Sequence, residues 1–209
     1  MNDPAAYHEV SVAGQGLFAL EHLLFEAEAT DYTCALTQAI TRGLAETATT
    51  LNNAWADHAR AVREASQPYQ SPAEVQRVLY TALSTGLEFL ESQRLGRPLG
   101  TFDRPRPKRA EARRSERSLR NIILSLETLQ TLATTLADRQ TPMTQAAFAE
   151  ANTRARALDD PALQGVADPA KRFKIEVLQQ KVAAIRVAIN DEIGAPLGVR
   201  AGFNSLDGD

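Results

Sequence analysis

The stretch that decides the fold is "DPAKRFKIEVLQQKVAAIRVAINDEIGAP", residues 168–196. Its apolar side chains recur every three or four positions, which is the spacing of one face of an α-helix. Asp168 is placed to cap such a helix, and Pro169 suits the first helical position, where an N–H has no partner within the helix. The apolar stripe consists of Phe173, Val177, Leu178, Val182, Ile185, Ile189 and Ile193. The pattern predicts a helix over about residues 169–193, with one face that must be buried.

The same helical spacing continues through most of the remaining chain. It predicts further helices over about residues 32–66, 71–95 and 116–138, and a shorter one over about residues 144–158. Within the second of these, "SPAE" opens the helix as a capping box with proline at the first helical position. No alternating apolar–polar pattern of useful length indicates a strand. Four or more long amphipathic helices predict an all-α fold built as a helical bundle.

Length and composition place the chain among ordinary globular proteins. With 209 residues, of which 44% are hydrophobic, it can form a sizeable core, and we expect one domain over residues 1–209. The single cysteine, Cys34, allows no internal disulfide and is predicted to be a small core residue. No apolar stretch approaches the roughly 20 residues of a membrane span. The first basic residue is Arg42, so the sequence shows no signal peptide.

Positive charge is concentrated in one window. Residues 94–120 hold ten of the 23 basic residues and three acids, so the window carries +7 while the whole chain carries −3. Part of this window, about residues 96–110, is rich in proline and is predicted to be an irregular loop. Phe102 is its one aromatic residue, which gives no support for stacking on bases, and we expect no nucleic-acid partner. We expect the arginines to pair with acids of the bundle, with binding of an anion or an acidic partner as the alternative.

Three stretches together resemble one protein family. They are "GLFALEHLLF" at residues 16–25, "RLGRPLGTFDRPRPKRAEARRSERSLRNI" at residues 94–122 and "GFNSLDGD" at residues 202–209. In this order they are similar to the imelysin-like proteins, bacterial envelope proteins described as periplasmic lipoproteins and linked to iron uptake. The resemblance implies an all-α fold, a periplasmic or envelope location, and a connection with iron or another divalent metal. Because relatives carry a signal sequence and a helical segment before the first stretch, we expect this chain to correspond to the C-terminal portion of the family pattern.

The resemblance also points to a site region. The family motif Gly-x-His-x-x-Glu matches Gly16, Phe18 and Glu21, so phenylalanine stands where the family has histidine. Positions 18 and 21 lie on one face of a helix, where a histidine and a glutamate could share a metal. His22 does not replace the missing ligand, because it points about 100° away from Glu21. Glu21 is therefore the one candidate metal ligand that the motif leaves.

A polar pocket around Glu21 is the candidate binding site. A carboxylate among leucines needs hydrogen-bond donors or a cation, and the basic window and the polar C-terminal end supply such groups. Ser115 or Ser118 is alternatively expected to cap the helix that begins there, and the polar end is alternatively a turn that packs the terminus. We expect Glu21 to belong to a structural polar network, with ligand binding as the alternative. The predicted pocket residues are Gly16, Glu21, Arg114, Ser115, Arg117, Ser118, Asn121, Asn204 and Asp207.

No catalytic motif accompanies this pocket. The three histidines, His8, His22 and His58, do not have zinc-site spacing, and His-Glu-x-x-His, Gly-x-Ser-x-Gly, phosphate-loop and dinucleotide motifs are missing from the sequence. We therefore predict a non-enzymatic binding or accessory protein of the bacterial envelope, with a metal ion or an anion as its ligand. One alternative is a metallopeptidase, which the family name suggests. Another is a structural helical module that contacts a protein partner or a missing N-terminal segment.

Overall fold

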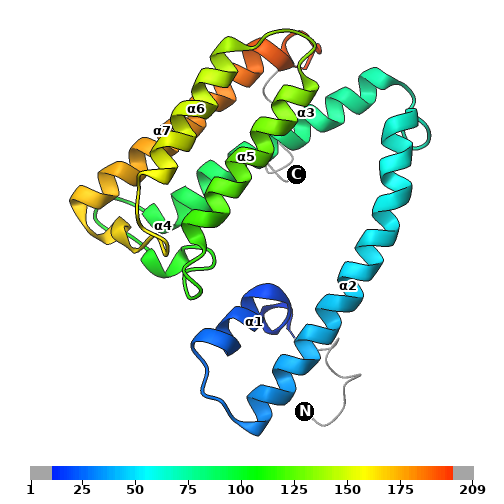
Figure 1. Ribbon diagram of the computed structural model, residues 1–209. Helices are drawn as coiled ribbons and strands as arrows, with labels where there is room; N and C mark the ends of the chain where they lie inside the picture. Colours follow the sequence, from blue (N-terminus) through cyan, green and yellow to red (C-terminus); the bar gives the residue numbers. More distant parts are fainter. Residues whose placement is uncertain (1–10, 200–209) are drawn as a thin grey trace. The chain divides into compact units, whose positions relative to one another are not determined.

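The computed structural model describes residues 11–199, and these form helices and connecting segments without a β-sheet (Figure 1). The sole strand-like feature in this range is an isolated bridge between Thr101 and Arg104. The chain divides into two compact units, Met1–Tyr69 and Gln70–Asp209. Within the described range, no helix combines the length and the apolar character needed to cross a membrane. The prediction of an all-α helical fold is confirmed.

The first unit is built from two helices that pack against each other, α1 (Gly16–Phe25) and α2 (Asp31–Glu64). Thr30 begins α2 with a reciprocal cap: its hydroxyl accepts from the Thr33 N–H at 3.2 Å, and its own N–H donates to the Thr33 hydroxyl at 2.8 Å. The bounds of α2 agree with the predicted helix to within two residues. Cys34 is exposed, so the prediction that it is a core residue is wrong.

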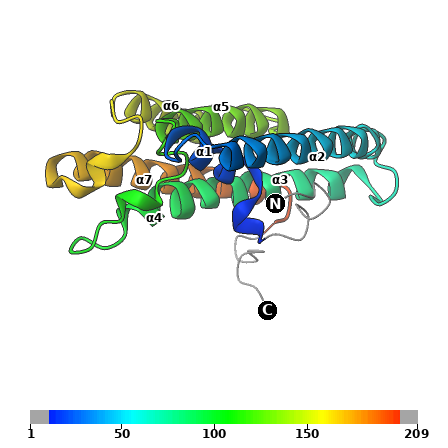
Figure 2. The same cartoon turned by 90° about the horizontal axis from the view of Figure 1, so that it is seen from below.

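The second unit is a four-helix bundle in two layers, with α5 and α6 over α3 and α7 (Figures 1 and 2). Successive helices of the bundle alternate in direction, so each packs antiparallel to the next (Figure 1). The four helices are α3 (Pro72–Phe89), α5 (Ser118–Leu136), α6 (Pro142–Arg156) and α7 (Pro169–Ile189). The shorter elements are η3 (Leu90–Gly96), α4 (Arg97–Leu99), η4 (Pro107–Arg109), η5 (Gln164–Ala167) and η6 (Asn190–Gly194).

The core of this unit forms around the apolar stripe of α7. Ile175, Leu178, Val182 and Ile185 are at most 1% exposed, and the stripe continues into η6. The predicted stripe is correct from Leu178 onward and wrong at its beginning, because Phe173 is 66% exposed. Counting back from Ile175 by three positions, the helical repeat reaches residue 172 rather than residue 173.

The helix that begins at α3 continues beyond its predicted end. It passes through η3, a π-helical segment, and through α4 before Gly100 ends it with a φ of 58°. Pro98 therefore lies inside the helical path, although the helix was predicted to end at about residue 95. Wider π-helical turns accommodate a proline that would disrupt regular α-helical hydrogen bonding. The irregular segment consequently begins at Gly100 instead of about residue 96, and it extends to α5.

A close approach explains one glycine of the bundle. Gly194 ends η6 against the ring of Tyr80, and a Cβ added at Gly194 would lie 2.5 Å from the Tyr80 Cζ atom. Tyr80 is buried, and burial, followed by the Asp191 charge, raises the pKa of its phenol. The glycine thus allows the end of η6 to lie against α3 without displacing the aromatic ring.

The helix starts of this unit use two kinds of cap. Asp168 caps α7 as predicted, accepting from the Ala170 N–H at 2.9 Å, and Ser71 caps α3. Thr141 precedes α6 and supplies no side-chain cap. A carboxylate distant in sequence replaces it: Glu192 accepts from the Met143 N–H at 3.1 Å and from the Thr144 N–H at 2.7 Å. The end of α7 is therefore joined to the beginning of α6 by a charge-assisted cap.

We expect Glu192→Ala to lower the free energy of unfolding by about 1–2 kcal/mol at pH 7, because two helix-terminal N–H groups lose their acceptor. Glu192→Gln should lower the free energy of unfolding by less, since the glutamine side chain keeps one acceptor oxygen. Urea denaturation at several pH values measures both effects, with Asp103→Asn as a control at an exposed carboxylate.

The effect of Glu192 should depend on pH. Burial raises the pKa of Glu192, but the hydrogen bonds from Thr144 and Met143 outweigh burial and hold the pKa below its usual value. The contribution of Glu192 to the free energy of unfolding is therefore complete above the unfolded pKa of about 4.3. This contribution is lost as the pH falls through the folded pKa. A stability difference between wild type and Glu192→Ala that is as large at pH 3 as at pH 7 would contradict this role.

Candidate functional site

The irregular segment between α4 and α5, residues 100–117, is called the basic segment below. A polar cluster centred on Arg94 lies where η3 meets this segment. Arg94 Nε donates to Glu111 Oε2 at 2.9 Å and Nη2 donates to Oε1 at 3.2 Å, so the ion pair is bidentate. Arg94 Nη1 also donates to the Asn121 carbonyl at 3.2 Å and to the Ser125 hydroxyl. Both charged side chains are 22% exposed. A single guanidinium thus connects η3, the basic segment and α5.

Two predicted pocket residues belong to this cluster. Ser118 is buried and donates its hydroxyl proton to the Glu111 carbonyl at 2.6 Å. Asn121 Nδ2 lies 3.5 Å from Glu111 Oε1, at the limit of a hydrogen bond. Both side chains therefore contact Glu111 and fasten the irregular segment to α5. The arrangement reverses the expected pairing, because here the acid lies in the segment and the arginine lies on the helix.

The other predicted residues around the start of α5 have different surroundings. Arg117 is exposed and is the N-cap residue of α5, with no side-chain cap hydrogen bond. Arg114 and Ser115 are half-buried. The expectation that Ser115 or Ser118 caps α5 is wrong: the Ser115 hydroxyl donates to the Ala112 carbonyl at 3.3 Å, and the Ser118 hydroxyl is directed to the Glu111 carbonyl. The tight turns before α5 draw both hydroxyls toward carbonyls instead of helix N–H groups.

Sequence reasoning missed the residues at the centre of the cluster. Arg94 and Glu111 were counted only as part of the charged window, and their separation along the chain matches no helical spacing. One signal was present, however. Ser118, Asn121 and Ser125 recur at three- and four-residue intervals, so they form a polar stripe on one face of α5. Such a stripe beside the apolar face of an amphipathic helix indicates a polar partner.

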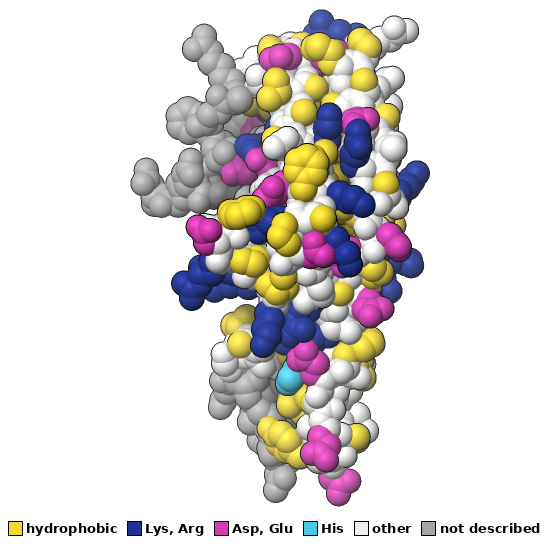
Figure 3. All heavy atoms as spheres, turned by 90° about the vertical axis from the view of Figure 1, so that its left-hand side faces the viewer, with side chains coloured by type: hydrophobic (Ala, Val, Ile, Leu, Met, Phe, Trp, Pro, Cys, Tyr) yellow, Lys and Arg dark blue, Asp and Glu magenta, His cyan; other side chains and the backbone are white. Residues whose placement is uncertain are grey.

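An open apolar groove of about 530 Å³ lies beside this cluster, between α3 and α5. Arg94 and Ser125 border it, and Phe89 and Leu124 give it an exposed apolar wall. The Arg94 guanidinium lies 5.5 Å from the centre of the Phe89 ring, a cation–π distance. On the face drawn in Figure 3, basic side chains are interspersed with acidic and hydrophobic ones. Within the basic window, the ion pair with Glu111 balances the charge of Arg94.

Glu21 is the distinctive residue of the first unit. It is 8% exposed and is the one buried residue of α1, all of which the structure describes. Phe18, at the position of the family histidine, is 60% exposed. His22 is directed to Glu26, with 3.1 Å between Nδ1 and Oε2. Gly16 begins the helix with a φ of 79°, a conformation that favours glycine. The burial of Glu21 agrees with its expected role as a buried polar residue.

Two further predicted pocket residues, Asn204 and Asp207, lie outside the described residues, as does His8. That Glu21 shares a pocket with the residues at the start of α5 and with the C-terminal end stays a prediction.

The described residues do not fit a metal held by the protein. Phe18 has no donor atom, and a bound zinc or iron ion needs several ligands. Within residues 11–199, no three His, Cys, Asp or Glu side chains lie close enough together to hold an ion. Glu21 is buried on a helix without a second ligand at the motif position. A structural role, in which donors satisfy this carboxylate, suits Glu21 better than direct metal ligation.

We expect the Arg94–Glu111 pair to contribute measurably to stability. A double-mutant cycle with Arg94→Met and Glu111→Gln should give a coupling free energy of about 1–2 kcal/mol, because the pair is bidentate and mostly shielded from water. The matched control is Arg156–Glu127, whose side chains are 62% and 42% exposed and which should couple by about 0.5 kcal/mol or less. Equal coupling in both pairs, measured by urea denaturation, would contradict the anchoring role.

Glu21→Ala should lower the free energy of unfolding by about 1–4 kcal/mol, the range for removing one member of a buried polar network. Glu21→Gln should be milder, because it keeps an acceptor. Equilibrium unfolding of both variants measures the effect, and Glu28→Ala at an exposed position is the control. Calorimetric titration with zinc and iron(II) should give the same result for wild type and Glu21→Ala. Unchanged stability would remove support for the network, and tight metal binding lost in Glu21→Ala would identify Glu21 as a ligand.

The comparisons with known proteins give one match. The family model of imelysin matches residues 2–189, which include α1 with Glu21, the basic segment with the Arg94 cluster, and all of α7. Neither the curated proteins nor the solved structures give a significant match. The third stretch of the resemblance, residues 202–209, lies beyond the matched range. Because the match covers most of the sequence and both units, the chain belongs to the imelysin family.

Proposed function

We propose that this chain is a non-enzymatic binding or accessory protein of the bacterial envelope, connected with the uptake of iron or another metal. The observation that carries the proposal is the burial of Glu21 on α1, the helix that holds the family motif. A buried carboxylate is costly unless donors or a ligand compensate its charge, so its presence on an otherwise apolar helix favours a binding role. The periplasmic location is part of the proposal and rests on the family.

The chemistry of the motif favours binding over catalysis. In a zinc peptidase, histidine and carboxylate side chains hold the metal, and an additional base activates its bound water. Here the histidine position holds Phe18, whose side chain is largely exposed and cannot ligate. The α1 helix therefore offers a carboxylate that can accept hydrogen bonds but supplies no obvious metal-activating set.

The ligand we favour is an anion. Exposed arginines follow one another at the start of α5, where Arg117 and Arg120 have their side chains in solvent. The guanidinium fork matches carboxylate and phosphate groups through two parallel hydrogen bonds. A metal that reaches such a surface as a negatively charged complex would be recognised through its anionic groups. A bare metal ion is the alternative ligand.

Two other functions are the alternatives to this proposal. A metallopeptidase activity is suggested by the family name alone. A structural helical module is favoured by α2, where Ile40 and Ala61 are the buried residues while Leu51 and Trp55 are 64% and 61% exposed. An apolar face of this kind drives association when no partner covers it. Concentration-dependent dimer formation in sedimentation experiments, abolished by Trp55→Glu, would favour the structural module.

The purified chain should not cleave insulin B chain, with or without added zinc, because it lacks a recognisable metallopeptidase motif. Mass spectrometry of the incubated peptide detects any product, and a known zinc peptidase is the positive control. A trace contaminant is distinguished by repeating the assay with Glu21→Ala. Zinc-dependent cleavage that persists through further purification and disappears in this variant would overturn the non-enzymatic proposal.

A further inference from the structure

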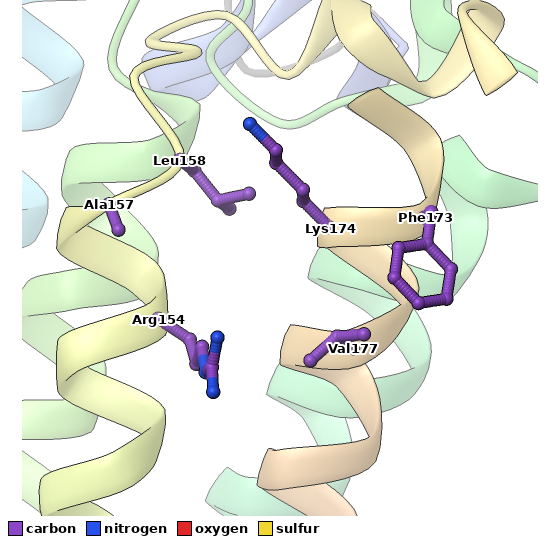
Figure 4. Close-up of a pocket in the computed structure, with 6 residues that line it drawn as sticks. All are labelled: Arg154, Ala157, Leu158, Phe173, Lys174 and Val177. Atoms are coloured by element: carbon purple, nitrogen blue, oxygen red, sulfur yellow. The ribbon is translucent and has the colours of Figure 1, made fainter. Parts of the chain in front are cut away.

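A second cleft lies in the bundle, away from the family motif and the Arg94 cluster. It is formed between the last turns of α6 and the first turns of α7 and has a volume of about 210 Å³ (Figure 4). Both walls belong to helices that pack closely along most of their length, so the cleft is built on rigid elements. Its lining consists of Arg154, Ala157, Leu158, Phe173, Lys174 and Val177.

Two cations face this cleft from opposite walls. Arg154 projects from α6 and Lys174 from α7 (Figure 4). Lys174 makes no hydrogen bond or ion pair with any residue in the described part of the chain. Arg154 uses its Nε to donate to Glu150 Oε1 at 2.9 Å, which leaves both terminal nitrogens without a described partner. The cleft therefore presents the Lys174 ammonium and the terminal nitrogens of Arg154 to a ligand, although Glu150 already pairs with the Arg154 guanidinium.

One acid, Glu150, pairs with Arg154 but not with Lys174. Glu150 is shared, because Lys181 Nζ also lies 3.7 Å from Glu150 Oε1. The hydrogen bond from Arg154 is the main cause that lowers the pKa of Glu150, so this carboxylate is already committed as an acceptor. Glu150 thus pairs with two basic side chains, Arg154 and Lys181. Among the described residues no acid pairs with Lys174, so an incoming anion would find its ammonium uncompensated.

The remaining lining is apolar. Leu158 and Val177 are half-buried and point into the cleft from opposite helices (Figure 4). Phe173 is 66% exposed at the α7 side, an unusual position for an aromatic side chain that contributes nothing to the core. A ligand with an apolar body would cover part of this surface. The combination of a few charged groups with an apolar lining is typical of small-molecule sites.

We propose that this cleft binds a small monocarboxylate with an apolar body, such as a short fatty acid or a single-ring aromatic acid. The carboxylate pairs with the Lys174 ammonium, which lies at the opposite end of the cleft from the Arg154 guanidinium (Figure 4), and the apolar body contacts Leu158 and Val177. The volume is below the range of about 300–1,000 Å³ that drug-sized ligands occupy, which limits the ligand to a short chain or one ring. None of these residues belongs to the proposed pocket around Glu21, so each proposal can be tested independently of the other.

Hexanoate is the probe that tests this proposal, by chemical-shift titration of the full chain. It should bind saturably with a dissociation constant in about the millimolar range, as expected for so small a ligand. The resonances of residues 154–158 and 173–177 should shift together. Hexanol, which keeps the chain without the charge, and acetate, which keeps the charge without the chain, should each bind at least about tenfold more weakly.

Variants locate the site. Lys174→Gln should weaken hexanoate binding by about tenfold, because it removes the charge-assisted contact, and Arg154→Gln should weaken it less, because that guanidinium lies at the other end of the cleft and pairs with Glu150. Lys171→Gln makes the same charge change on α7 outside the cleft and should leave binding unchanged. Val177→Phe, which fills the cleft while keeping both cations, should also weaken it. Unsaturable shifts, equal binding of hexanol, or full affinity in Lys174→Gln would each overturn the proposal.

Discussion

The second unit depends on burial of the apolar stripe of α7. This helix packs against α6, against α3 and against η3, and its stripe is almost completely removed from water. Truncation of one such leucine or isoleucine to alanine typically costs about 2–5 kcal/mol, a large fraction of the stability of a domain this size. The other helices are arranged so that each presents an apolar face to this one. Even the glycine at the end of η6 serves the same packing, since it lets the chain lie against Tyr80.

A buried arginine, Arg172, ends the apolar stripe of α7 on its N-terminal side. Arg172 takes the next core-facing position and is 6% exposed, so its guanidinium needs acceptors. Its Nε donates to Glu176 Oε1 and its Nη1 to the Leu99 carbonyl, each at 2.7 Å, and it lies 5.9 Å from the centre of the Phe102 ring. The Leu99 carbonyl belongs to a helix end that lacks an intrahelical partner. One buried cation thus closes the core and holds the beginning of the basic segment, while Arg94 holds its later part.

The two units use their polar groups differently, and this bears on function. In the bundle, Arg94, Arg172 and Glu192 each satisfy backbone or side-chain groups of neighbouring elements. Among the described residues the Lys174 ammonium in the cleft between α6 and α7 has no such partner, which is why that cleft suits a ligand. In α1, one carboxylate is buried on a helix whose apolar side chains are largely exposed. With Leu17 and Leu24 exposed and Glu21 buried, the burial pattern of α1 is the opposite of that of α7.

The sequence by itself determined the helices, most of their ends and the family. Periodicity locates a helix because side-chain spacing is a local property, and caps such as Asp168 act on N–H groups within the same turn. The tertiary structure decided which residue begins the α7 stripe, why the chain stays helical through Pro98, and that Arg94 meets Glu111 and Glu192 caps α6. It also showed that the stripe of α2, similar in pattern to that of α7, has few buried members. Amphipathic spacing specifies a face, whereas the partner of that face, or of a charge, is set by contacts between residues far apart in the chain.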